Sequence, residues 1–115
     1  MTELSLYLDK RRGEVFFQEP GSYRDTVANV AFVERGGKIV ATLRPSKGVR
    51  DVVPVRPGDR IIKIYVSNRR NVYIGVLEVV EDEEGKGLVW KELETFVNPP
   101  VSVLEGLGLS KEDVP

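Results

Sequence analysis

Apolar and polar residues alternate along several short stretches of the chain, and this period of two predicts β-strands. Near the start, Leu4, Leu6 and Leu8 alternate with more polar neighbours, and a second β-rich run covers residues 14–18. Later strands are predicted over residues 38–43, 60–66, 72–81 and 88–97. The run at 72–81 is the most apolar of these, so we expect it in the interior of a sheet.

Prolines, glycines and charged clusters mark the connections between these strands. Pro20-Gly21 ends the second run, and the acidic residues 82–87 predict a hairpin loop. Residues 44–58 hold three prolines, two glycines and four basic residues, which predicts a long, exposed, positively charged connection. Near the end of the chain, residues 101–107 and 110–113 are predicted to form short helical turns.

Two structures are compatible with residues 22–35. Ser22 and Asp25 resemble a capping box, apolar residues recur on one helical face, and Gly36-Gly37 would end a helix. The alternative is a hairpin, because the segment contains several β-branched residues and the two glycines can form its turn. We predict the helix, over residues 22–35.

Together these elements predict one α+β, mainly β domain over residues 1–115, with residues 1–13 as an N-terminal strand and turn extension. Several short strands around one helix are typical of a small, mainly antiparallel barrel or sheet with helical caps. An OB-fold or an SH3-like barrel fits this pattern equally well. Periodicity therefore predicts the class of fold but not its topology.

The amino-acid composition limits the catalytic, redox and metal-binding chemistry of which the chain is capable. It contains no cysteine and no histidine, which excludes disulfides, thiolate catalysis and histidine-based acid–base or metal chemistry. The longest run of carboxylates, at residues 81–84, predicts a solvated loop tip rather than a metal site. We therefore expect no catalytic residues, no metal and no cofactor, and predict that the protein is not an enzyme.

Other features of the composition bear on where the protein works. No apolar run approaches the roughly 18 residues that cross a bilayer, and the N-terminus lacks the features of a secretory signal. We therefore expect no membrane partner and a cytoplasmic location. The frequent Arg, Glu and Val and the scarce Cys, His, Met and Gln resemble the composition of thermophile proteins.

The net charge of −1 conceals an uneven distribution of charge along the chain. Between residues 44 and 71, Asp51 and Asp59 are the only acids among eight basic residues: Arg44, Lys47, Arg50, Arg56, Arg60, Lys63, Arg69 and Arg70. Residues 78–113 are strongly acidic. A basic middle third can attract a polyanion through its local field, although solvated faces of neighbouring strands would explain the same pattern.

Five segments follow one another along the chain in an order that matches a known family. They are residues 17–23 with their Glu-Pro, Gly48-Val49-Arg50, the Gly-Asp turn and strand at 55–67, residues 74–80, and residues 90–97 leading into Pro100-Val101-Ser102. Together they resemble the EVE family of PUA-like domains. Gln18 and Asp51-Val52 depart from the family's usual residues. The ASCH and YTH groups share the same architecture.

This resemblance implies a small PUA-like mixed β-barrel of 5–6 strands, with one helix near residues 22–35 and short C-terminal helical turns. It also implies nucleic-acid binding, in which a modified base of DNA or RNA occupies a pocket on the barrel. Such a domain would be the targeting module of a modification-dependent restriction or RNA-related system, fused to or associated with a motor or nuclease domain. The alternatives are a protein-interaction module and a small ASCH-like enzyme.

Candidate binding residues follow from what nucleic acids require, which is cations for phosphates and aromatic platforms with polar groups for bases. For Phe17 and Trp90 the alternative is core packing, and for Asn68 it is a place in a turn. One continuous phosphate surface requires residues 44–58 and 67–71 to lie at the same end of the fold, whereas a straight strand at 60–66 separates them. The expected base pocket comprises Phe17, Ser22, Tyr23, Tyr65, Ser67, Asn68 and Trp90, and the expected phosphate contacts are Arg44, Lys47, Arg50, Arg69 and Arg70.

Overall fold

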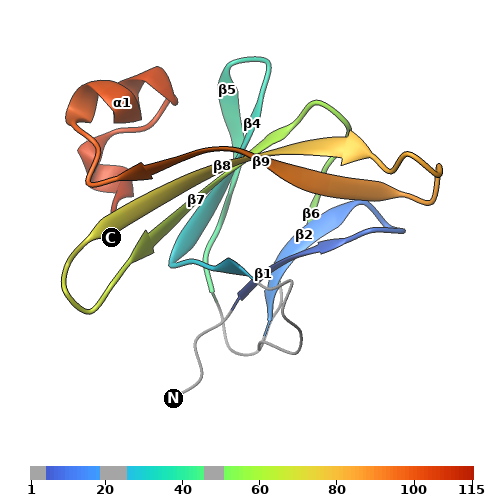
Figure 1. Cartoon of the computed structure of the whole chain (residues 1–115), viewed down its shortest axis with the longest axis horizontal. Coiled ribbons are helices and arrows are strands. Elements are labelled where there is room, and N and C mark those ends of the chain that lie inside the picture. The colour runs from blue at the N-terminus through green and yellow to red at the C-terminus, as the bar shows by residue number, and fades with distance from the viewer. Residues whose placement is uncertain (1–4, 19–25, 46–50) are drawn as a thin grey trace.

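A computed structural model describes residues 5–18, 26–45 and 51–115 of the chain. These residues form nine strands in two antiparallel sheets, followed by a helix and a 3-10 turn (Figure 1). The larger sheet has the strand order β5-β4-β7-β8-β9, and the smaller has the order β3-β1-β2-β6. The mainly β prediction is thereby confirmed.

The larger sheet is built from two hairpins. One joins β4 (Val30–Arg35) to β5 (Lys38–Leu43), and the other joins β7 (Arg60–Val66) to β8 (Val72–Glu81). The strand β9 (Leu88–Val97) returns along β8 and forms one edge. The prediction that residues 72–81 form an interior strand is confirmed, because β8 has a partner on each side.

The smaller sheet packs across one half of the larger one. It contains β1 (Ser5–Asp9) and β2 (Glu14–Gln18), with β3 (Thr26–Val27) and β6 (Val53–Pro54) as short edge strands. In Figure 1, β1 and β2 lie under the right-hand part of the larger sheet, away from the turn between β7 and β8. The part of this face next to the β7–β8 turn therefore lies beyond the described strands of the smaller sheet.

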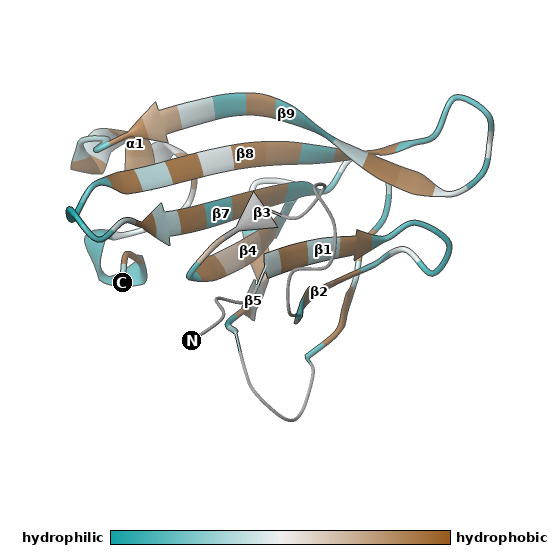
Figure 2. Cartoon of the chain, turned by 60° about the horizontal axis from the view of Figure 1, so that its bottom comes forward, coloured by the Kyte–Doolittle hydropathy of each residue, from teal (hydrophilic) through white to brown (hydrophobic). Residues whose placement is uncertain are grey.

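Side chains on the two faces of the larger sheet enter two separate cores. Toward the smaller sheet, Ile61, Leu77 and Val79 pack with Leu6, Val15 and other buried residues. On the opposite face, Ile62, Ile64 and Ile74 pack against the C-terminal segment, which contains α1 (Val101–Gly106) and a 3-10 turn (Lys111–Asp113). Figure 2 shows the hydrophobic residues along β8 that supply both cores.

The predicted helix over residues 22–35 is wrong. Residues 22–25 lie outside the described residues, but residues 26–27 are β3 and residues 30–35 are β4. Gly36 and Gly37 have φ values of +60° and +84° and form the turn of the β4–β5 hairpin. The alternative prediction, a hairpin with these two glycines in its turn, is therefore the correct one for residues 30–43. Four successive residues of β4, Val30 to Val33, are buried, because the strand lies between two neighbours and contributes to both cores. A strand buried on both faces has no polar alternation to distinguish it from a helix.

The predicted barrel also needs correction. The nine described strands exceed the expected 5–6, and every described strand pair is antiparallel rather than mixed. The larger sheet does not close, because β5 and β9 are its edges. The two short C-terminal helical turns are present as predicted.

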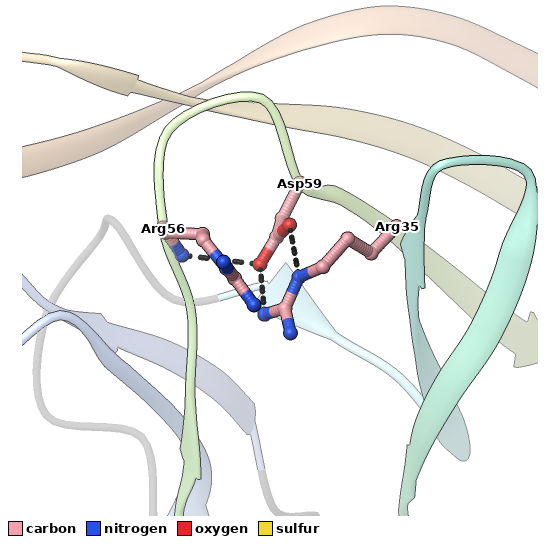
Figure 3. A network of polar contacts seen from close by, with 3 residues as sticks. All are labelled: Arg35, Arg56 and Asp59. Atoms are coloured by element: carbon pink, nitrogen blue, oxygen red, sulfur yellow. Dashed lines mark hydrogen bonds and ion pairs between the residues drawn. The ribbon is translucent and has the colours of Figure 1, made fainter.

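A buried carboxylate fixes the loop that leads into β7 (Figure 3). The side chain of Asp59 is 2% exposed, and Arg35 donates to it from Nε at 2.8 Å and from Nη2 at 2.7 Å. The backbone amide of Arg56 donates a third hydrogen bond, 3.0 Å long. Burial alone would raise the pKa of Asp59, but these hydrogen bonds and the positive charges of Arg35 and Arg56 lower the pKa below its ordinary value.

Candidate nucleic-acid interface

Two rows of side chains cross β7, β8 and β9 on the part of the face that lies beyond the described strands of the smaller sheet. Backbone register places Tyr65 opposite Tyr73, and Tyr73 opposite Val97; we call these three residues the aromatic row. The two tyrosine rings stack with their centroids 6.2 Å apart and their planes 26° apart. Tyr73 is 36% exposed and Val97 is 59% exposed, so a planar ligand can reach this row.

Backbone hydrogen bonds hold the strand on both sides of Tyr65. The amide of Asn29 donates to the carbonyl of Ile64 at 2.8 Å, and the amide of Val66 donates to Oδ1 of Asn29 at 2.6 Å. Asn29 therefore extends the pairing of β4 with β7 beyond the end of β4. Hydrogen bonds from the main chain and the side chain of Asn29 to the backbone of β7 therefore fix the position of Tyr65, as a binding platform requires.

The second row lies two residues further along each strand and contains Lys63, Gly75 and Thr95, which we call the lysine row. The side chain of Lys63 lies over Gly75: a Cβ atom built on Gly75 would stand 2.5 Å from Cε of Lys63 and 3.2 Å from its Cγ. The absence of a side chain at position 75 therefore lets Lys63 extend across β8 toward β9. Burial lowers the pKa of Lys63, and the negative charge of Glu92 partly opposes this effect.

A β-bulge brings Glu92 to this face. The register of β8 with β9 shifts between Val76 and Leu77, so that Glu94 lies opposite Val76 and Glu92 lies opposite Leu77. The shift leaves Leu93 as the extra residue and places Glu92 on the same face as Thr95, whose hydroxyl donates to Oε1 of Glu92. In a regular strand, residues three apart point to opposite faces, so the bulge is what places Glu92 on the same face as Lys63.

The turn between β7 and β8 presents cations beside the aromatic row. The amide of Ser67 donates to the carbonyl of Asn71 at 2.9 Å, and Oγ of Ser67 accepts from the amide of Asn71 at 3.2 Å. Asn68, Arg69 and Arg70 are exposed, and Figure 2 shows the turn as hydrophilic. Two guanidinium groups therefore follow Tyr65 within five residues of the chain.

The structure separates the predicted base-pocket residues into three groups. Tyr65, Ser67 and Asn68 lie together at the β7–β8 end of the larger sheet. Phe17 is 6% exposed in the core between the sheets, and Trp90 packs against the same core. Ser22 and Tyr23 lie outside the described residues. The open aromatic row, not an enclosed pocket, is the surface that collects predicted residues.

The two pockets beside the C-terminal segment contain none of the predicted base-pocket residues. One has a volume of about 160 Å³ between α1 and the β4–β5 hairpin, with Glu34, Arg60 and Glu105 among its lining. The other has a volume of about 340 Å³ and is lined mainly by apolar side chains, including Val72, Leu104 and Val114. Both lie on the face opposite the aromatic row.

The predicted phosphate contacts are also distributed. Arg69 and Arg70 are in the β7–β8 turn, and Lys47 and Arg50 lie outside the described residues. Arg44 is exposed and directly follows β5, whose last residue lies opposite Ala31, itself opposite Lys63. Arg44 is thus at the same end of the larger sheet as the β7–β8 turn, with β4 between them. The 44–58 connection therefore begins at the end of the larger sheet where residues 67–71 lie, as one continuous phosphate surface requires. The connection finishes at the opposite end of the sheet, where β7 begins.

Sequence reasoning missed Tyr73, Glu92 and Thr95 and gave Lys63 no role. A signal existed for Tyr73, because a turn over residues 67–71 brings residues 65 and 73 opposite each other in the hairpin. Lys63 shares the alternating face of Tyr65, which also follows from the strand period. No sequence pattern marks the bulge at Leu93, so the position of Glu92 was not predictable.

Comparisons with protein-family models, with curated proteins and with solved structures find no match for this chain. Within the described ranges, no group of three or more His, Cys, Asp or Glu residues is placed to hold a metal ion. No helix in the described part of the chain is long and apolar enough to cross a membrane.

Proposed function

We propose that this protein binds single-stranded nucleic acid on the open part of the larger sheet. Bases stack on the aromatic row, and Arg69 and Arg70 contact the phosphates of the same strand. The single observation that carries this proposal is the stacked pair of the half-buried Tyr65 and the exposed Tyr73, with two exposed arginines in the turn that joins their strands.

The exposure of the aromatic row favours unpaired bases. A base stacked on an aromatic ring gains about 1–3 kcal/mol, whichever base it is, because every base has a π-face. In a duplex these faces are covered by neighbouring base pairs, and extruding a base costs a few kcal/mol. Two adjacent tyrosines on an open strand face offer no enclosure to offset that cost, so single strands are the better ligand.

The sequence supports the same class of ligand independently. The EVE-like segments imply nucleic-acid recognition, and Arg50 in the Gly-Val-Arg segment belongs to the basic middle third of the chain. Membership of the EVE family, a PUA-like origin of the two-sheet fold, the reading of a modified base and an association with a motor or nuclease domain stay predictions.

Fluorescence anisotropy with labelled single-stranded DNA and RNA decamers of mixed sequence tests the proposal, with the matching duplexes alongside. We expect binding to single strands at low salt, and about a five-fold or greater loss of affinity for Tyr65→Ala and for Tyr73→Ala. Replacing Arg69 by Gln should reduce the slope of log K against log salt by about 0.7, because one phosphate contact is lost.

Tyr7→Ala is the matched control. Tyr7 stacks on Phe16 across β1 and β2 with ring centroids 6.0 Å apart, so the variant removes the same kind of cross-strand pair from the smaller sheet. Unchanged affinity in Tyr7→Ala supports the aromatic row as the binding surface. The proposal fails when the wild-type protein retains no single strand at low salt, or when Tyr7→Ala loses as much affinity as Tyr73→Ala.

A further inference from the structure

We infer that Lys63 and Glu92 select guanine among the bases that stack on the aromatic row. This inference rests on the proposed function and names the base that the surface prefers. It comes from two local departures from a regular sheet, the glycine at position 75 and the bulge at Leu93, which together place an ammonium and a carboxylate beside the tyrosines.

The position of Lys63 depends on Gly75. Any larger residue at position 75 would put its Cβ within 2.5 Å of the lysine side chain. With glycine there, the aliphatic part of Lys63 lies over β8, and the negative charge of Glu92 on β9 acts on its ammonium group. The side chain therefore lies along the lysine row instead of extending outward to solvent.

The position of Glu92 depends on the bulge. Glu92 acts electrostatically on Lys63, and Thr95 holds one carboxylate oxygen by a hydrogen bond. An ionised carboxylate has about four lone-pair positions on its two oxygens, so the bond from Thr95 leaves acceptor positions for a ligand. Lys63 and Glu92 thus present a donor and an acceptor on the same face of the larger sheet.

The spacing of the rows matches a base that lies on the tyrosines. Two residues along an antiparallel strand span about 7 Å. A base centred on the aromatic row therefore directs one edge toward the lysine row, where a hydrogen bond of about 3 Å closes the remaining gap. Phosphates extend the other way, toward Arg69 and Arg70, and away from the negative charge of Glu92.

The Watson–Crick edge of guanine is the best complement to this pair. It presents the acceptor O6 beside two donors, the N1–H group and the N2 amino group. Lys63 can donate to O6 while the carboxylate of Glu92 accepts from N1 and N2. Adenine, cytosine and uracil each present at most one donor group on this edge, so they leave part of the carboxylate's capacity unused.

The test is anisotropy with decamers of deoxythymidine or uridine that carry one central guanine, adenine or cytosine. We expect the guanine decamer to bind about five-fold tighter or better than the other two. A central inosine, which lacks the N2 amino group, should lose most of this preference. A central 7-deazaguanine, which changes only the opposite edge, should retain it.

Variants of the chain distinguish the effect of removing the charges of Lys63 and Glu92 from the effect of displacing the Lys63 side chain. Glu92→Gln and Lys63→Met should each reduce the ratio of guanine to adenine affinity below about two-fold. Gly75→Ala keeps both charged groups but displaces Lys63, and it should reduce the ratio as well. Glu94→Gln is the matched control, because it removes the same charge from the neighbouring position on the opposite face, and it should retain the wild-type ratio.

The outcomes distinguish this inference from the proposed function. Decamers that bind through Tyr65 and Tyr73 with equal affinity for every central base overturn the guanine preference and leave single-strand binding intact. Loss of binding to 7-deazaguanine also overturns the inference, because it shows that another edge is read. If guanosine monophosphate competes as well as the guanine decamer, guanine recognition stands and the strand platform is refuted.

Discussion

Asp59 offers the most direct test of how the charged residues hold this fold together. Asp59→Asn keeps the size of the side chain and removes its charge. In the native protein the carboxylate accepts two hydrogen bonds from Arg35 and one from the amide of Arg56. An asparagine retains one acceptor oxygen, and its amino group replaces the other, so at least one donor of these three would face another donor.

The expected loss follows from burial and from the number of bonds. Breaking a buried ion pair by removing one partner costs about 3–5 kcal/mol. Asp59 is 2% exposed, but the side chain of Arg35 is 34% exposed and can turn toward water. We therefore expect a smaller loss, about 2–3 kcal/mol of unfolding free energy, which corresponds to a fall in Tm of roughly 10 °C for a domain of this size.

Urea and thermal denaturation, followed by the fluorescence of the single tryptophan, measure this loss. The pH dependence adds a second test. The pKa of Asp59 is lower in the folded protein than its ordinary value of 3.8, so its contribution is fully present above that value and is lost as pH falls through the folded pKa. The unfolding free energy of the wild-type protein should therefore fall more steeply below pH 4 than that of Asp59→Asn.

Asp51→Asn is the control, because Asp51 is exposed and the variant makes the same charge change. It should alter the unfolding free energy by no more than about 0.5 kcal/mol. If Asp59→Asn is as stable as this control at neutral pH, or if its stability below pH 4 follows the wild-type curve, Asp59 does not stabilise the loop as argued.

Two further predictions concern the packing between the sheets. Gly87 has φ +119°, and a Cβ there would stand 2.2 Å from the carbonyl oxygen of Lys10, whereas Gly85 has φ +68° and open space around it. In urea denaturation, Gly87→Ala should lose about 2 kcal/mol or more of unfolding free energy, and Gly85→Ala should lose about 1 kcal/mol. Equal losses would contradict the close approach of Gly87 to Lys10. Phe17→Ala should lose about 3–5 kcal/mol because its ring is 6% exposed in the core; a variant of normal stability with altered base preference would instead show that the ring is a pocket wall.

Local pattern was sufficient for much of this protein. The alternation along residues 60–66 and 72–81 predicted two strands, and the turn at 67–71 contains the information that Tyr65 and Tyr73 face each other. The same alternation placed Tyr65 and Lys63 on one face. These properties follow from the sequence because they depend on near neighbours and on the period of two that every strand has.

Tertiary structure decided the rest. Residues 30–33 were ambiguous because β4 is buried on both faces, a fact that depends on β5, β7 and both cores. Glu92 lies on the same face as Lys63 only because of a bulge that exists relative to β8. Asp59 is paired with an arginine 24 positions earlier in the chain. Each of these features arises from contact between segments that are distant in sequence. Local periodicity does not determine which of these segments pair or pack together.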